Sequence, residues 1–124
     1  MNIPGLITAF RASGTFVKRR LVVHGASEGL AAQAVGGSAL LIGVTTDVGA
    51  SEGDHVDVIR SGLALVVYGD AVAAGDPLTS DATGAAVPAG AGDFFIGYAE
   101  VAGSAEEIGS VWIAPGQLPA AAGG

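Results

Sequence analysis

The stretch LLIGVTTDVGASEGDHVDVIRSG, residues 40–62, returns in a related form as FFIGYAEVAGSAEEIGSVWIAPG at residues 94–116. Each copy has a short apolar run, a turn of small and acidic residues, and a segment that alternates apolar and polar residues, which is the pattern of a β-hairpin. At an offset of 54, and with one slipped residue in the second strand, the copies align at Ile42/Ile96, Gly43/Gly97, Gly49/Gly103, Glu52/Glu106, Val56/Val111 and Val58/Ile113. The sequence therefore predicts a duplicated β-hairpin unit.

The remaining segments also have the character of short strands. Residues 21–34 and 78–89 each show a strand, a turn of small residues and a second strand, so the duplication is expected to cover most of the body. Residues 62–68 (GLALVVY) form a continuous β-type run that suits a central strand. No stretch has helical periodicity over three turns. Many short strands separated by close turns predict an all-β barrel or sandwich-like fold.

The chain of 124 residues suits one domain with a single core. We expect that domain over residues 15–114, with an N-terminal arm over residues 1–14 and a flexible tail rich in Pro, Ala and Gly over residues 115–124. The 24 Ala and 21 Gly leave few large side chains for a core. A small core favours a homo-oligomer, because association buries additional surface.

The charges are unevenly distributed along the chain. From residue 21 onward there are one basic and twelve acidic residues, a net charge of -11. Such an acidic body repels phosphate backbones, which argues against nucleic acid as a partner. No apolar run approaches the roughly 20 residues of a membrane span, and the start lacks the pattern of a signal peptide, so we expect a soluble protein made in the cytoplasm with no membrane partner. The other four basic residues come first: Arg11, Lys18, Arg19 and Arg20.

Lys18, Arg19 and Arg20 occupy the centre of residues 15–23 (TFVKRRLVV), a segment that is β-rich at both ends. Two interpretations remain open. The segment is an edge strand whose cations discourage pairing with other sheets, or it is a basic patch for an acidic partner surface.

Catalytic and metal-binding patterns are weak. Alternation places His55 and Asp57 on one face of a strand, where the carboxylate of an Asp can orient an imidazole as a general base. No Gly-x-Ser-x-Gly element accompanies them, and the second hairpin copy lacks the histidine, so an exposed polar strand face is the preferred interpretation. His24 and His55 lack metal-binding spacing, there is no cysteine, and no phosphate-binding or EF-hand motif occurs. We expect no enzyme activity, no cofactor and no metal.

Trp112 lies in the last predicted strand, between Val111 and Ile113. If Val111 and Ile113 face the core, alternation turns Trp112 outward. An outward tryptophan is a common anchor of protein interfaces, so Trp112 is a candidate contact residue.

Three pieces of the sequence together resemble the head decoration, or cement, proteins of tailed bacteriophages. They are residues 73–89 (AAGDPLTSDATGAAVPA), residues 96–99 (IGYA) and residues 110–113 (SVWI). The resemblance extends over about residues 17–114. It implies a non-enzymatic protein with a β-tulip or β-clip-like domain, which binds the outer surface of the capsid, commonly as a homotrimer. Proteins of this kind bridge major capsid subunits and thereby stabilise the shell, and the resemblance implies the same role here.

The resemblance also suggests a use for the basic segment. Decoration proteins often lay an N-terminal arm along the shell, and a basic cluster there would meet an acidic capsid surface. Two alternatives remain: a β-clip-like domain that binds a small ligand or assists an enzyme, and a structural component of the phage tail or baseplate. The candidate partner-contacting residues are Arg11, Phe16, Lys18, Arg19, Arg20 and Trp112.

Overall fold

The computed structural model describes residues 3–119. This part of the chain contains strands and turns but no helix, and therefore no helix that crosses a membrane. The prediction of an all-β fold built on a small barrel is confirmed. In chain order the strands are β1 (Ile3–Pro4), β2 (Ile7–Ala12), β3 (Leu21–His24), β4 (Leu30–Gln33), β5 (Leu41–Thr45), β6 (His55–Ile59), β7 (Gly62–Val67), β8 (Pro77–Ser80), β9 (Ala86–Pro88), β10 (Phe94–Ala99) and β11 (Ile108–Gln117).

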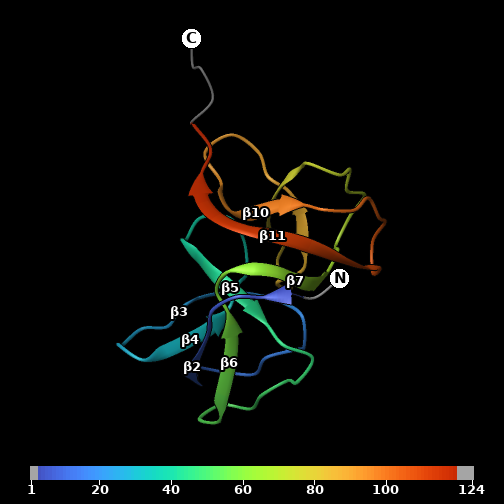
Figure 1. The fold of residues 1–124 in the computed structure, drawn as a ribbon. Helices are drawn as coiled ribbons and strands as arrows, with labels where there is room; N and C mark the ends of the chain where they lie inside the picture. Colours follow the sequence, from blue (N-terminus) through green and yellow to red (C-terminus); the bar gives the residue numbers. More distant parts are fainter. Residues whose placement is uncertain (1–2, 120–124) are drawn as a thin grey trace.

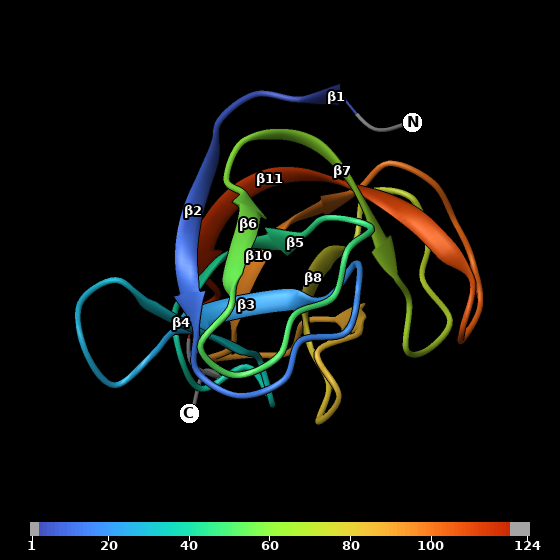
Figure 2. The same ribbon diagram turned by 90° about the horizontal axis from the view of Figure 1, so that it is seen from below.

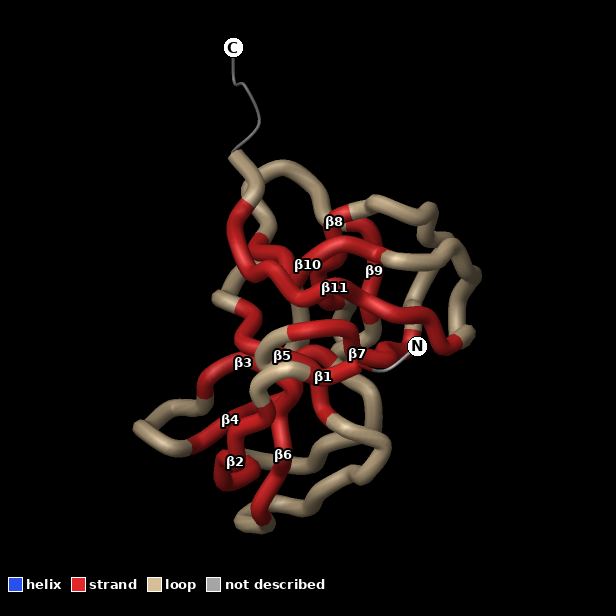
Figure 3. Tube along the Cα trace, in the orientation of Figure 1, coloured by secondary structure: helices blue, strands red, loops and turns tan. Residues whose placement is uncertain are grey.

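The strands form two lobes (Figures 1 and 3). The first lobe, residues 7–59, is a closed barrel in the order β2-β4-β3-β5-β6, and the view from below shows these strands together (Figure 2). The second lobe, residues 62–117, supplies five strands of a six-stranded sheet in the order β1-β7-β11-β10-β8-β9. Both lobes are thus five-stranded units, and β1 is added to the edge of the second.

The two lobes are copies of one pairing scheme. The antiparallel pairs β3–β4, β3–β5, β5–β6 and β2–β6 of the first lobe recur as β8–β9, β8–β10, β10–β11 and β7–β11. The parallel contact that closes the barrel, Ala12 with Ala31, recurs as a parallel bridge between Tyr68 and Ala86. The duplication predicted from one hairpin therefore extends over a whole five-stranded unit.

The register of the second hairpin strand differs from the sequence alignment. Val58 pairs with Thr45 and Val111 pairs with Ala99, so Val58 is the structural counterpart of Val111 and not of Ile113. Likewise, Val56 corresponds to Gly109. The prediction was wrong because the turn after β10 is one residue shorter than the turn after β5, whereas the alignment had made it one residue longer.

The Ile-Gly pair shared by both copies has a steric cause. A Cβ atom on Gly43 would collide with the carbonyl oxygen of Ile59, and one on Gly97 would collide with the carbonyl oxygen of Trp112. At both places the hairpin strands approach too closely for any side chain. The glycine is therefore required by the fold at the same point of each copy.

Two apolar clusters stabilise the molecule. The barrel interior is filled by Ala12, Phe16, Val22, Ala31, Ile42, Val56 and Val58. The larger cluster joins the outer face of the barrel to the second lobe and includes Leu21, Leu41, Val44, Ile59, Val66, Leu78, Ile96, Val111 and Ile113. The larger cluster contains side chains from both lobes. Apolar surface of each lobe is therefore buried against the other lobe.

Tyr68 is the largest fully buried side chain and fills the second lobe. Its counterpart in the barrel is Ala12, and room for its ring comes from Gly103 and Gly109, where any Cβ would meet the tyrosine ring. The Tyr68 hydroxyl donates to the carbonyl oxygen of Val101 at 2.7 Å. The second lobe thus places one large ring beside glycines at the position where the barrel has a small alanine.

Within the described residues, the segment predicted as an N-terminal arm over residues 1–14 contains two strands. Ile7–Ala12 is β2, a strand of the barrel that pairs with β6 along its length. The same antiparallel ribbon continues through the hydrogen bonds from Arg60 N–H to Leu6 O and from Gly5 N–H to Ser61 O, and it ends in β1 beside β7. The strand that pairs with this segment, β6, comes much later in the chain. The sequence of the segment itself therefore gives little indication of the pairing.

The predicted tail over residues 115–124 is also partly ordered. Residues 115–117 continue β11, and Leu118 N–H donates to Asp93 O at 2.9 Å. Residues 1–2 and 120–124 lie outside the described residues.

Candidate functional site

The cationic residues 18–20 lie in a loop that both lobes hold in place. This basic loop, residues 17–20, precedes β3. The buried Thr45 hydroxyl accepts a hydrogen bond from Arg20 N–H at 2.9 Å and donates one to Val17 O at 3.1 Å. Val67 N–H, from the second lobe, donates to Arg19 O at 3.0 Å. The loop is therefore neither an edge strand nor a free arm but a fixed projection at the junction of the lobes.

The three cationic side chains differ in their exposure and in the hydrogen bonds that they form within the molecule. Lys18 is exposed, and Arg19 is half-buried. Arg20 donates through Nη1 to the carbonyl and hydroxyl oxygens of Thr83, at 3.1 and 3.2 Å, which ties the loop to the turn after β8. Lys18 and Arg19 are thus the cations best placed to meet another molecule.

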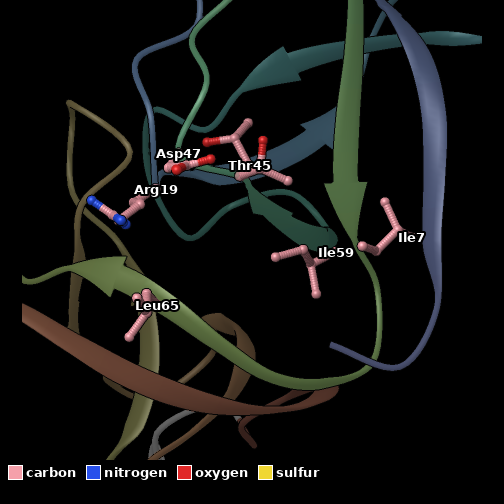
Figure 4. A pocket seen from close by; sticks show the side chains of 7 residues that line it. Ile7, Arg19, Thr45, Asp47, Ile59 and Leu65 are labelled. Atoms are coloured by element: carbon pink, nitrogen blue, oxygen red, sulfur yellow. The ribbon is translucent and has the colours of Figure 1, made fainter. Parts of the chain in front are cut away.

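Beside the loop lies a small cleft of about 190 Å³ (Figure 4). Arg19 and Asp47 approach it from one side, and Ile7, Ile59 and Leu65 line it elsewhere. Pockets for small molecules commonly measure about 300–1,000 Å³. The cleft is smaller than that range and suits at most one side chain of a partner.

A larger groove of about 720 Å³ runs past Arg20, Gln33 and Asp81. Two of its polar side chains form hydrogen bonds within the fold: Gln33 Nε2 donates to Thr83 O at 2.9 Å, and Asp81 Oδ1 accepts from Thr83 N–H at 2.8 Å and from Ala85 N–H at 3.0 Å. A ligand-binding module requires polar groups that converge on the ligand. The groove therefore gives no support to the ligand-module alternative.

Phe16 cannot serve as a surface contact. Its side chain is 3% exposed and packs in the barrel interior, and its backbone forms a bridge with Ala50. The adjacent cations had suggested a surface segment, but Phe16 fills the barrel while Val17 and Lys18 face outward. Arg11 is exposed on β2, and its Nη1 donates to Gly53 O at 2.9 Å.

The His55 and Asp57 pair lies on the exposed face of β6, with Val56 and Val58 buried on the other face. The alternation predicted from the sequence is confirmed. Within residues 3–119 no group of three or more His, Cys, Asp or Glu side chains is arranged to hold a metal ion.

Trp112 points outward, as predicted: it is 55% exposed, whereas Val111 and Ile113 are 0% and 7% exposed. It belongs to a row that the sequence did not reveal. Trp112 pairs with Leu63 on β7 and with Tyr98 on β10, and Tyr98 pairs with Pro77 on β8. We call these four residues the apolar row: Leu63, Trp112, Tyr98 and Pro77. These residues come together only through the pairing register of the strands, so no local sequence pattern indicates the row.

The comparisons with known proteins agree with this architecture. A family model described as a phage cement protein matches residues 6–113. The chain belongs to the phage cement protein family. It is thus a structural protein of the bacteriophage virion, associated with the capsid.

The crystal structure of the N base of the head fiber gp8.5 of bacteriophage phi29 resembles this cement protein with a TM-score of 0.70. The match covers 91% of this chain and 97% of the other, at 20% sequence identity, and so supports the fold. No curated protein sequence matches the chain.

The charges of this cement protein are segregated between its lobes. All five basic residues lie within residues 11–60, which also hold five acidic residues. Residues 62–119 hold seven acidic residues and no basic one. One lobe is therefore close to neutral with a basic loop, and the other is uniformly acidic.

Proposed function

We propose that this protein binds the outer surface of a phage capsid and stabilises the shell by bridging major capsid subunits. The observation that carries the proposal is the fixed basic loop on a member of the cement protein family. Hydrogen bonds from Thr45 and Val67 to the loop backbone hold Lys18 and Arg19 at the lobe junction, so little backbone conformational entropy is lost when they bind.

The partner surface is expected to be acidic. The two exposed cations would meet its carboxylates, and the acidic second lobe, which an acidic shell repels, would point away from it. Contacts of this kind are screened by salt, so binding should weaken as ionic strength rises. A homotrimer would engage three capsid subunits at once, which raises the overall affinity through effective concentration.

The test is binding to purified capsids that lack the decoration protein, measured by co-sedimentation over a range of salt concentrations. The variant Lys18→Ser/Arg19→Ser should bind more weakly and lose most of the salt dependence. Arg60→Ser is the control: it removes a cation that lies over the Phe10 ring, 5.6 Å from its centroid, and should leave binding unchanged. Equal binding of the double variant and the wild type at every salt concentration would refute the role of the basic loop.

A further inference from the structure

Within residues 3–119, two residues other than glycine have a positive φ angle: Arg19 at 57° and Glu106 at 71°. Side chains rarely adopt this left-handed conformation, because the Cβ atom crowds the backbone, whereas glycine adopts it freely. Residues held in such conformations are common at functional sites. Arg19 and Glu106 therefore occupy positions at which glycine would be the more stable residue.

Glu106 stands where the first lobe has a glycine. Its N–H donates to Tyr68 O at 2.8 Å, and in the barrel Gly53 N–H donates to Ala12 O at 2.9 Å. Ala12 and Tyr68 are counterparts, since each makes the parallel contact between the first and fourth elements of its lobe. Gly53 has a φ angle of 85°, and a Cβ atom on it would meet no atom within 4 Å. The fold thus requires a positive φ angle at this position but no side chain.

Arg19 stands in the same relation to a glycine of the second lobe. It precedes β3 by two residues, as Gly75 precedes β8, the counterpart of β3. Both residues donate their N–H to the chain at the end of β5 or β10, Arg19 to Thr46 O at 3.0 Å and Gly75 to Ala99 O at 2.7 Å. Gly75 has a φ angle of 90°, with open space around a Cβ atom. Each lobe therefore has glycine at one of the two positions and a charged residue at the other.

The side chains of Arg19 and Glu106 take no part in the hydrogen bonding of the fold. Their neighbours Arg20 and Glu107 carry the same charges and form side-chain hydrogen bonds within the molecule. Arg19 and Glu106 form none with any residue from 3 to 119; Glu106 is exposed, and Arg19 is half-buried beside the small cleft. An interaction with another molecule explains why a less stable residue is kept at each position.

The two residues flank the end of β7. Val67 N–H donates to Arg19 O at 3.0 Å, and the carbonyl oxygen of the next residue, Tyr68, accepts from Glu106 N–H. Successive residues of a strand direct their hydrogen-bonding groups to opposite edges, so Arg19 and Glu106 lie about two strand spacings apart, roughly 10 Å. The groove of about 720 Å³ is lined by residues of both the basic loop and the turn that holds Glu106. A positive and a negative group thus lie on either side of one strand end.

We propose that Arg19 and Glu106 form a two-charge site that orients this protein on a capsid subunit, in which a carboxylate of the subunit meets Arg19 and a cation of the subunit meets Glu106. The inference rests on the proposed function and deepens it, since it adds a basic group to the partner surface and assigns a contact to the second lobe. Complementary charges fix the register of an interface. A half-turn of the protein on the shell would bring each charge against its like.

The first experiment is binding to capsids that lack the decoration protein, and it distinguishes the two-charge site from a uniformly acidic partner surface. Glu106→Gln removes the charge and keeps the backbone conformation, so it should raise the Kd for capsids about two- to fivefold. Glu106→Arg should weaken binding further, because it meets the cation of the subunit. The control Glu100→Gln removes another exposed acidic residue of the second lobe and should not weaken binding.

A uniformly acidic surface predicts the opposite sign, since the loss of any carboxylate reduces repulsion. Binding of Glu106→Gln or Glu106→Arg that equals or exceeds that of the wild type would overturn the proposal.

The second experiment is thermal unfolding, which tests whether the two charged residues serve the fold. Arg19→Gly and Glu106→Gly should raise the unfolding temperature by about 2–4 °C, because glycine relieves the strain of a positive φ angle, while both weaken capsid binding. The controls Gly53→Ala and Gly75→Ala should lower the unfolding temperature by a similar amount and leave capsid binding unchanged. A fall in the unfolding temperature of both glycine variants would show that the side chains stabilise the fold, and would refute the site.

The outcomes separate this inference from the proposed function. If Lys18→Ser/Arg19→Ser loses capsid affinity while Glu106→Gln keeps it, the basic loop binds capsids but the two-charge site is refuted. If the wild type binds no capsids at any salt concentration, capsid binding is refuted and the site with it. Sedimentation of free Glu106→Gln should give the mass of the wild type. A different mass would assign Glu106 to a contact between copies and overturn the proposal.

Discussion

Gly97 lies against the carbonyl oxygen of Trp112, with no room for a side chain between the two strands. The same relationship holds between Gly43 and Ile59 in the barrel. The Ile-Gly pair that first indicated the duplication is therefore a steric requirement of each lobe.

Replacing Gly97 by Ala should lower the free energy of unfolding by about 1–3 kcal/mol, because the added methyl group forces β10 and β11 apart. The measurement is urea-induced unfolding followed by circular dichroism. Gly36→Ala is the control, since its Cβ would meet no atom within 4 Å, and it should be nearly neutral. Equal stabilities of the two variants would contradict the steric argument.

Phe16→Ala should lower the free energy of unfolding by about 3–5 kcal/mol, because it empties the centre of the barrel. Val17→Ala, at the adjacent exposed position, should change it by less than about 0.5 kcal/mol. Thermal unfolding of both variants tests the assignment of Phe16 to the core. An unfolding temperature of Phe16→Ala close to that of Val17→Ala would show that Phe16 lies at the surface.

Tyr68 should make stability depend on pH in the alkaline range. Burial raises the pKa of Tyr68 above 10.0, and the Asp76 carboxylate raises it further. The folded state therefore holds the phenol proton more tightly than the unfolded state does. Its contribution to stability is complete below the ordinary tyrosine pKa of about 10 and is lost as the pH rises toward the folded-state pKa.

The variant Tyr68→Phe isolates that contribution. It should be less stable by roughly 1 kcal/mol at neutral pH, since Val101 O loses its donor. Its stability should then fall less steeply than that of the wild type above pH 10 or so. Parallel alkaline curves for the two proteins would exclude Tyr68 as the titrating group.

Thr45→Val should loosen the basic loop. The substitution preserves shape but leaves Arg20 N–H and Val17 O without the hydroxyl that joins them, at a loss of about 1–3 kcal/mol in stability. If Lys18 and Arg19 bind capsids only when the loop is fixed, capsid affinity should fall as well. Thr15→Val, at an exposed position, is the control. Undiminished capsid affinity in Thr45→Val would mean that the ordering of the loop does not matter for binding.

Local sequence was a good guide where one face of a strand is buried by its own hairpin partner. The alternation of His55, Val56, Asp57 and Val58 indicated which side chains face water, and the structure agrees. Alternation also turned Trp112 outward between Val111 and Ile113. In both cases a two-residue period fixes direction without any knowledge of distant partners.

Local sequence failed where the decisive contact is distant. Ile7–Ala12 became a barrel strand because β6 pairs with it, and Phe16 turned inward because Ala50 holds its backbone. Pro4, Gly5 and Gly14 punctuate this region as they would a terminal arm, so composition alone favoured the wrong interpretation.

The sequence by itself determined that the chain is all-β, that a glycine-centred hairpin occurs twice, and that the cations cluster before residue 21, because periodicity, close strand approach and charge order are local properties. Only the tertiary structure decided that Ile59 is covered while its counterpart Trp112 is exposed. The two residues occupy the same position in copies of one unit. Their different exposure follows from which lobe lies on top of the other, and packing between lobes depends on the whole chain.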